Sequence, residues 1–204
     1  MTEETAAAQL SGCDGLIVPG GFGDRGVEGM IVTARYAREQ NIPYLGICLG
    51  MQVAVIEFAR HVCGLQEASS GELDPQSPHK VIDFLPDQSD SVSKGGTLRL
   101  GAYPCAIAPG SRMQRCYGAE LISERHRHRY EFNNDYRKLL SERGLSLCGT
   151  SPDGYIVEAV ELPEHRYFIG VQFHPEFKSR PNRPHPLFMG LISASLETGI
   201  EEKE

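Results

Sequence analysis

The sequence contains no apolar run long enough to cross a membrane and no basic-then-apolar segment at its N-terminus. A membrane-spanning helix needs roughly 20 predominantly apolar residues, and a secretory signal joins a basic stretch to an apolar one. The longest apolar runs here, such as GLIVPG and YLGICLGM, are far shorter. We therefore expect a soluble, cytoplasmic protein with no membrane partner.

An excess of positive charge and closely spaced cysteines are also missing. Twenty lysines and arginines against 27 acidic residues give a formal net charge of -7, which argues against a large electrostatic contact with nucleic acid. The six cysteines form no C-x-x-C pair and no zinc-like spacing, so neither a disulfide framework nor a structural metal is expected. We expect mostly free thiols, a small-molecule partner, and no nucleic acid or metal.

Strand and helix patterns alternate in the first third of the chain. An apolar strand at 16–18, a glycine-rich turn at 20–26 and an amphipathic helix at 27–40 are followed by a strand at 44–47 and a helix at 49–62. This repetition predicts an α/β fold, a three-layer sandwich with helices on both faces of a mostly parallel central sheet. A length of 204 residues suits one domain.

The rest of the chain is less regular. Residues 67–96 are rich in Ser, Asp, Pro and Gly around one apolar island at 81–85, which predicts a loop-rich excursion over the surface. Further strands are predicted at 97–100, 103–106, 145–148, 156–160 and 167–173, helices at 134–143 and 186–196, and an acidic tail at 197–204.

Cys48 carries the strongest signal for catalysis. It stands between a predicted strand and a predicted helix and is flanked at two residues on each side by Gly46 and Gly50. This is the pattern of a nucleophile elbow, in which a sharp turn presents the sulfur and glycines let neighbouring backbone approach. The N–H groups at a helix N-terminus also favour a thiolate. Most intracellular cysteines are inert buried thiols, and we expect this of the other five.

A histidine and a carboxylate follow another predicted strand, in GVQFHPEF. His174 and Glu176 lie two residues apart around Pro175. Because the carboxyl ends of parallel strands meet at one edge of a sheet, we expect His174 near Cys48. A cysteine nucleophile needs a base, and the base needs an acceptor that orients it. A lone histidine is more often structural, but this combination favours a Cys-His-Glu site.

The glycine-rich turn matches G-x-G-x-x-G at Gly21, Gly23 and Gly26. Alone, this pattern is a weak signal for dinucleotide binding, and the acidic residue expected about 20 positions later is missing. We prefer another use, in which N–H groups of the turn point at a developing oxyanion together with the amide of Leu49.

The stretch SERHRHRYEFN alternates two kinds of side chain. If extended, it places Arg125, Arg127, Arg129 and Glu131 on one face and His126, His128 and Tyr130 on the other. A metal site at His126 and His128 lacks an obvious third ligand, so an ordinary polar strand or a substrate-recognition segment is preferred.

Several segments together resemble one family. GICLGMQ, GGFGDRGVEGM, GGTLRLG, ERHRHRYEFN and FHPEF followed by SRPNRPHPLF are similar to the glutaminase domain of CTP synthases, a group of class I glutamine amidotransferases. The similarity runs from about residue 14 to residue 192. It implies a flavodoxin-like amidotransferase fold and hydrolysis of L-glutamine to glutamate and ammonia through a thioester.

The resemblance also implies a role for each site residue. Cys48 would attack the glutamine amide, His174 would act as base and acid, and Glu176 would orient His174. The amides of Gly21 and Leu49 would form the oxyanion hole, Gly21, Gln52, Glu72 and Arg129 would hold glutamine, and Arg25 and Arg99 would couple GTP activation to hydrolysis. A solvated surface position is the alternative for these last two arginines.

Partners and cofactors follow from the same resemblance. Glutamine hydrolysis needs no cofactor, whereas ATP, UTP and Mg²⁺ belong to a synthetase domain that aminates UTP to CTP; GTP activates the enzyme, and full-length members form tetramers. The family's glutaminase domain has a further strand and helix before DGLIVPGG, where about 13 residues stand here. An unpaired strand edge is costly, so we expect marginal stability, a covering partner or residues omitted from the sequence.

Two other functions stay open at this point. A cysteine hydrolase of γ-glutamyl bonds would keep Cys48 and His174 but would release an amine or a peptide. A catalytically impaired fragment would only bind a nucleotide or a partner chain. The intact set of Cys48, His174 and Glu176 favours a working glutaminase.

Overall fold

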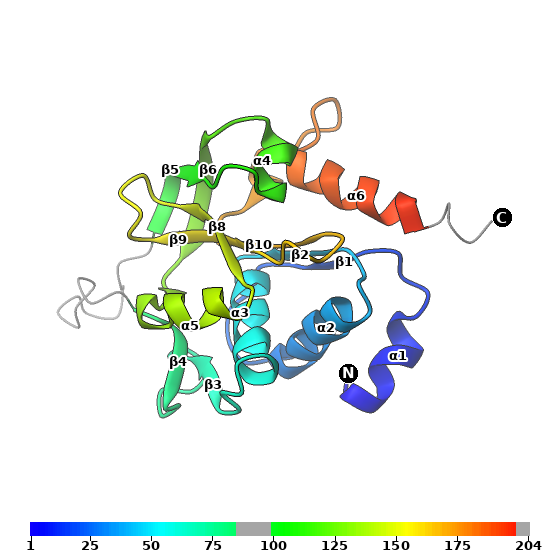
Figure 1. Ribbon diagram of the computed structural model, residues 1–204, viewed down its shortest axis with the longest axis vertical. Helices are drawn as coiled ribbons and strands as arrows, with labels where there is room; N and C mark the ends of the chain where they lie inside the picture. Colours follow the sequence, from blue (N-terminus) through cyan, green and yellow to red (C-terminus); the bar gives the residue numbers. More distant parts are fainter. Residues whose placement is uncertain (85–98, 199–204) are drawn as a thin grey trace.

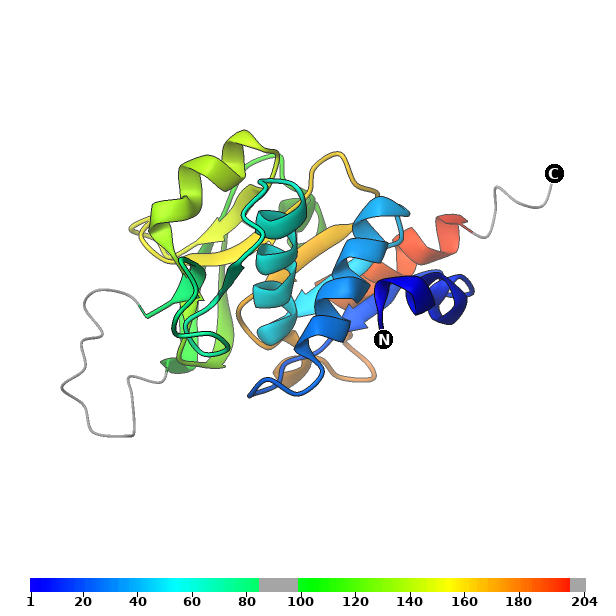
Figure 2. The same cartoon turned by 90° about the horizontal axis from the view of Figure 1, so that it is seen from below.

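A seven-stranded sheet forms the centre of the molecule. The computed structural model describes residues 1–84 and 99–198 (Figures 1 and 2). The strand order is β1-β2-β10-β9-β8-β5-β6, with a separate sheet β3-β4-β7. The strands are β1 Leu16–Val18, β2 Tyr44–Ile47, β3 Ala68–Ser70, β4 His79–Asp83, β5 Arg99–Ile107, β6 Leu121–His128, β7 Glu131–Phe132, β8 Ser146–Thr150, β9 Val157–Glu161 and β10 Phe168–Val171.

Helices cover both faces of the central sheet. The helices are α1 Glu3–Leu10, α2 Val27–Glu39, α3 Leu49–His61, α4 Arg112–Tyr117, α5 Arg137–Glu142 and α6 Pro186–Thr198, with 3-10 turns η1 Asn134–Tyr136 and η2 Pro175–Phe177. Figure 1 shows α4 and α6 on one side of the sheet and α1, α2, α3 and α5 on the other. Within the two described ranges, no helix has the length and apolar character needed to cross a membrane.

Helix α3 is the centre of the hydrophobic core. Eleven of its 13 residues are buried, because it packs against β2 and β10 on one side and against the small sheet on the other. Tyr44 and Phe168, neighbours on β2 and β10, stack with ring centroids 4.4 Å apart. Removal of this apolar surface from water is the main stabilising contribution to the fold. It fixes the strand end and the helix start between which Cys48 lies.

The predicted three-layer α/β sandwich is confirmed, but the central sheet is mixed. Strand β2 pairs in parallel with β1 and with β10. The remaining four pairs, among β10, β9, β8, β5 and β6, are antiparallel. The expectation of a mostly parallel sheet is therefore wrong outside β1, β2 and β10. Strand and helix alternate only in the first third of the sequence, and the expectation applied this alternation to the whole chain.

Several predicted boundaries need correction. The strands predicted at 97–100 and 103–106 are one strand, β5, and residues 97 and 98 lie outside the described part. The helix predicted at 134–143 is divided into η1 and α5. The predicted loop-rich segment 67–96 contains β3 and β4, and its residues 85–96 lie outside the described part, as does most of the tail at 197–204.

The alternation predicted for SERHRHRYEFN ends earlier than expected. Arg125, Arg127 and Arg129 are exposed while His126 and His128 are buried, as alternation requires. Glu131 was expected on the exposed face but is fully buried. The physical reason is that β6 ends at His128 and Glu131 begins β7, which turns toward β4.

The residues before β1 form α1, which contacts α2. In the described part of the chain, β1 is an edge strand of the central sheet. The stability consequence expected for this edge stays a prediction.

Candidate active site

Cys48 lies at a sharp turn between β2 and α3. Its φ of 52° and ψ of -103° are unusual for a residue with a side chain, and such a conformation costs about 1–3 kcal/mol. The backbone N–H of Cys48 donates to the Val171 carbonyl at 2.7 Å, which ties the turn to β10. A Cβ atom at Gly46 would overlap the backbone of Gly50, and one at Gly50 would overlap the carbonyl of Val18. The turn therefore requires both glycines.

His174 is held by two contacts next to this turn. Its Nδ1 lies 2.6 Å from Oε1 of Glu176, and its ring stacks on Phe177 with centroids 5.1 Å apart. Because a carboxylate can only accept, Nδ1 carries a proton and donates it. Nε2 is buried and makes no hydrogen bond to any described residue. It is the ring nitrogen left for Cys48.

The surroundings of His174 favour its protonated form. The adjacent Cys48 side chain, first, and the hydrogen bond to Glu176, second, raise the pKa of His174 to about 9. Burial works to raise the pKa of Glu176, but the hydrogen bond to His174 lowers it on balance. An imidazolium beside the sulfur is the form that can give a proton to a leaving group.

This raised pKa predicts a pH-dependent contribution to stability. Because the folded-state pKa of His174 is raised from 6.5 to about 9, the stabilisation is complete below pH 6.5 and is lost as the pH rises through about 9. We expect the difference in melting temperature between the wild type and His174→Gln to shrink across this range in thermal unfolding. A difference that stays constant up to about pH 10 would contradict this expectation.

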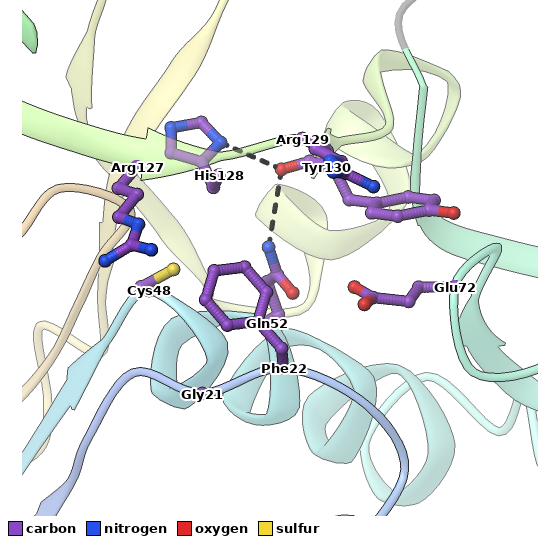
Figure 3. Close-up of a pocket in the computed structure, with 9 residues that line it drawn as sticks. All are labelled: Gly21, Phe22, Cys48, Gln52, Glu72, Arg127, His128, Arg129 and Tyr130. Atoms are coloured by element: carbon purple, nitrogen blue, oxygen red, sulfur yellow. Dashed lines mark hydrogen bonds between the residues drawn. The ribbon is translucent and has the colours of Figure 1, made fainter. Parts of the chain in front are cut away.

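A cavity of about 400 Å³ opens beside Cys48 (Figure 3). Its lining comes from the glycine turn, the start of α3, the loop after β3 and the end of β6. The lining residues are Gly21, Phe22, Cys48, Gln52, Glu72, Arg127, His128, Arg129 and Tyr130. A carboxylate and two guanidinium groups around one small cavity suit a ligand that carries both signs of charge.

The cavity brings together five residues that sequence reasoning selected: Gly21, Cys48, Gln52, Glu72 and Arg129. Figure 3 shows the Glu72 carboxylate directed toward Gln52. A Cβ atom at Gly21 would lie 3.2 Å from Cδ2 of Leu49, so the two residues expected to form an oxyanion hole come from adjoining segments. Their catalytic and binding roles stay predictions.

Gly20 leaves room for the imidazole ring of His174. A Cβ atom at this position would lie 2.9 Å from Cε1 of His174 and 3.5 Å from Cβ of Cys48. The ring of His174 cannot give way without loss of its contacts with Glu176 and Phe177. We expect Gly20→Ala to lower the activity of the site at least about tenfold, the effect of a small misplacement of a catalytic group.

The matched control is Gly12→Ala, where an added Cβ atom meets nothing within 4 Å. Both variants should melt within a few degrees of the wild type, as surface and loop changes of this size usually do. Equal activity of the two variants would show that His174 does not need the space above Gly20.

The two arginines assigned by resemblance to GTP coupling lie outside the cavity lining. Arg25 is exposed on the glycine turn. Arg99 is only 9% exposed and makes two hydrogen bonds to Glu158, from Nη2 at 2.8 Å and from Nη1 at 3.1 Å. A solvated surface position is therefore wrong for Arg99, whose side chain lies in the protein interior.

His126 and His128 form a neutral buried pair. Burial, the largest cause, and Arg99 lower the pKa of His126 to about 2 and that of His128 to about 3. Nδ1 of His126 lies 2.9 Å from Nε2 of His128, whose Nδ1 lies 3.1 Å from the Tyr130 carbonyl. Across the described ranges, no group of three or more His, Cys, Asp or Glu side chains is placed to hold a metal ion.

Sequence reasoning missed several residues around the sulfur. Gln172 is fully buried, with Nε2 3.6 Å from Sγ of Cys48. Its signal was available, since it stands two residues before His174 in the same motif. Phe22 is 65% exposed, and the guanidinium of Arg127 lies 5.9 Å from the centroid of its ring. The alternation of the arginines placed Arg127 on the same face as Arg129.

Comparisons with known proteins identify the family. Residues 1–194 match the family described as "Glutamine amidotransferase class-I". The chain is 62% identical over 193 residues to a CTP synthase of Moorella thermoacetica, covering 95% of this chain and 36% of the relative. It is 59% identical over 202 residues to a CTP synthase of Bacillus subtilis, covering 99% of this chain and 38% of the relative.

A solved structure gives the same result at the level of the fold. The glutaminase domain of Trypanosoma brucei CTPS, with bound acivicin, superposes with a TM-score of 0.91 at 42% identity, covering 95% of this chain and 75% of that one. The chain belongs to the class I glutamine amidotransferases and, within them, to the glutaminase domains of CTP synthases. It spans a little over a third of the length of these curated relatives.

Proposed function

We propose that this chain hydrolyses L-glutamine to glutamate and ammonia with Cys48 as nucleophile, His174 as base and acid, and Glu176 as the group that orients His174. The observation that carries the proposal is the strained turn at Cys48 beside His174, whose Nδ1 is hydrogen-bonded to the Glu176 carboxylate. The cavity next to it supports an amino-acid substrate, because its lining offers both a carboxylate and guanidinium groups.

The first half of the reaction makes a thioester. The sulfur of Cys48 attacks the side-chain amide carbon of glutamine, and the negative charge passes to the amide oxygen. The N–H groups of Gly21 and Leu49 would stabilise this oxyanion. His174 then gives the proton on Nε2 to the leaving nitrogen, the carbon–nitrogen bond breaks, and ammonia departs.

The second half releases glutamate. His174, now neutral at Nε2, takes a proton from a water molecule that attacks the thioester carbon. The oxyanion forms again at the same place, and the carbon–sulfur bond breaks. Gln52, Glu72 and Arg129 would hold the substrate throughout, with the Glu72 carboxylate on the ammonium group and the Arg129 guanidinium on an anionic or carbonyl group.

The ammonia has a destination under the same proposal. It would be used by a synthetase domain that aminates UTP to CTP with ATP and Mg²⁺, in a full-length tetramer activated by GTP. Arg25 and Arg99 would take part in the coupling of GTP to hydrolysis. The identity to CTP synthases supports this assignment.

Ammonia release from glutamine is the experiment that tests the function. The 204-residue chain should release ammonia and glutamate in equal amounts, and a glutamine-like electrophile should add to the peptide that contains Cys48. Preference for γ-glutamyl amines or peptides over glutamine would instead identify a γ-glutamyl hydrolase. A folded chain that neither turns over nor reacts, with or without GTP, would identify an impaired binding module.

A further inference from the structure

The side chain of Gln172 contacts the sulfur of Cys48. It follows the last residue of β10 and is fully buried. Its backbone N–H donates to the Glu158 carbonyl at 2.8 Å, and its side-chain Nε2 donates to Sγ of Cys48 at 3.6 Å. The amide is therefore held against the reacting atom, and Gln172 is not among the residues that line the cavity.

The Tyr130 carbonyl determines, through Gln52, which end of the Gln172 amide faces Cys48. The Tyr130 carbonyl can only accept, and it accepts from Nδ1 of His128 at 3.1 Å and from Nε2 of Gln52 at 3.3 Å. With its nitrogen turned to Tyr130, Gln52 gives its other N–H to Oε1 of Gln172 at 3.2 Å. The nitrogen of Gln172 must then face the sulfur of Cys48. The Tyr130 carbonyl thus fixes the orientation of the Gln52 amide, which in turn fixes that of the Gln172 amide.

We propose that Gln172 is a further catalytic residue, a fixed N–H donor that holds the sulfur of Cys48 and stabilises its negative form. This inference rests on the proposed glutamine hydrolysis. Hydrogen bonds to charged groups are about twice as strong as neutral ones, and at a buried position no water replaces a lost donor.

Other charged groups lie around the same sulfur. His174, with Glu176 behind it, follows β10, and Arg127 extends from β6 (Figure 3). Glu72 and Arg129 lie across the cavity. A Gln172 variant keeps all of these groups, so the lost donor is the chemical change that distinguishes the variant from the wild type.

The same chain of contacts joins substrate binding to the nucleophile. Both N–H groups of Gln52 are used, which leaves its side-chain oxygen for the cavity, where Figure 3 shows it turned toward Glu72. An ammonium group held between Gln52 and Glu72 would therefore favour the amide orientation that directs Gln172 at Cys48. Substrate recognition and nucleophile orientation share one residue.

The test is the alkylation of Cys48 by iodoacetamide in Gln172→Met, followed peptide by peptide with mass spectrometry from about pH 5 to 10. Methionine has a similar length and no N–H. We expect the rate-versus-pH curve of Cys48 to move up by about one pH unit and the rate at neutral pH to fall about tenfold, the effect of one hydrogen bond to a charged group. The kcat for glutamine should fall by a similar factor.

Cys105 and Cys148 provide the internal control, since both are fully buried and distant in sequence from the site. If Gln172 acted only on packing, the variant would expose them and their alkylation would accelerate. That outcome, or a Cys48 curve at the wild-type position, would overturn the proposal.

A second variant covers the case in which Gln172→Met does not fold. Gln172→Glu keeps the acceptor for Gln52 but replaces the donor by a carboxylate oxygen, and it should move the Cys48 curve further upward. An unchanged curve in this variant would also overturn the proposal. A wild-type chain that fails to hydrolyse glutamine while both variants shift the curve would refute the proposed function and would support the contact between Gln172 and the sulfur.

Discussion

Replacement of Cys48 by alanine is expected to lower the rate of glutamine hydrolysis by roughly four to six orders of magnitude and to abolish covalent addition of a glutamine-like electrophile. Under the proposed mechanism, no thioester forms without the sulfur, and His174 has no nucleophile to assist. Residual turnover would come only from substrate binding and from the oxyanion site. Ammonia release and the mass of the intact protein after treatment with the electrophile measure both effects.

The variant should nevertheless fold. Alanine keeps the Cβ atom at position 48 and the hydrogen bond from its backbone N–H to the Val171 carbonyl. Cys48 belongs to a buried apolar cluster, but alanine removes only one heavy atom from it. We expect a melting temperature within a few degrees of the wild type, as measured by thermal unfolding.

Cys148→Ala is the matched control. Cys148 is buried, as Cys48 is, and its thiol lies 3.8 Å from Sδ of Met113 in the same apolar cluster. This variant should lose some stability through the small cavity that it leaves but should keep the activity and the adduct. If both variants lost activity equally, packing and not nucleophilic chemistry would explain the effect of Cys48→Ala.

The elbow was predictable from sequence because its determinants are local. Gly46, Cys48 and Gly50 lie within five consecutive residues, and the strand and helix around them have clear apolar patterns. The approach of His174 was also predictable, since β2 and β10 are parallel neighbours whose ends meet. For these elements, local pattern and global fold agree.

The antiparallel half of the sheet was not predictable in the same way. Strand β5 pairs with β6 along eight residue pairs and with β8 at its far end, and the small sheet joins β4 to β7. Pairing partners depend on contacts between distant parts of the chain, which a local pattern does not encode. Local pattern therefore indicated several of these strands but not their directions, and it placed β3 and β4 in a loop-rich segment.

Arg99 shows the same limit at the level of one side chain. From the sequence, a role in GTP coupling was expected for Arg99 by resemblance, with a solvated surface position as the alternative. In the fold its partner Glu158 lies 59 residues away, and the two groups meet in the interior. The alternating pattern of SERHRHRYEFN likewise did not reveal that Glu131 turns inward toward the same arginine, at 3.4 Å.

In the interior cluster of Arg99, Glu131 and Glu158, the closest ion pair joins Arg99 to Glu158. Burial, the largest cause, raises the pKa of Glu131 to about 8 although Arg99 works to lower it. Burial therefore favours the neutral form of Glu131. Burial also raises the pKa of Glu158, again against the effect of Arg99. The guanidinium of Arg99 thus compensates mainly the carboxylate of Glu158, which it contacts through two nitrogen atoms.

Replacement of Arg99 by methionine is expected to lower the free energy of unfolding by about 3–5 kcal/mol, the usual cost of leaving one member of a buried ion pair without its partner. For a chain of this size the melting temperature should fall by about 10 °C. Urea unfolding and thermal unfolding of the variant at neutral pH measure the effect. Loss of activity would accompany loss of the fold, because His128 and the cavity wall are built on the same cluster.

The double variant Arg99→Met with Glu158→Gln separates charge from packing. Once the unpaired carboxylate is removed, we expect more than half of the lost stability to return, since a neutral buried group is far less costly than a charged one. A double variant no more stable than Arg99→Met would show that the aliphatic packing of Arg99 matters instead. An Arg99→Met chain as stable as the wild type, but insensitive to GTP, would favour the direct role in activation that the family resemblance implies.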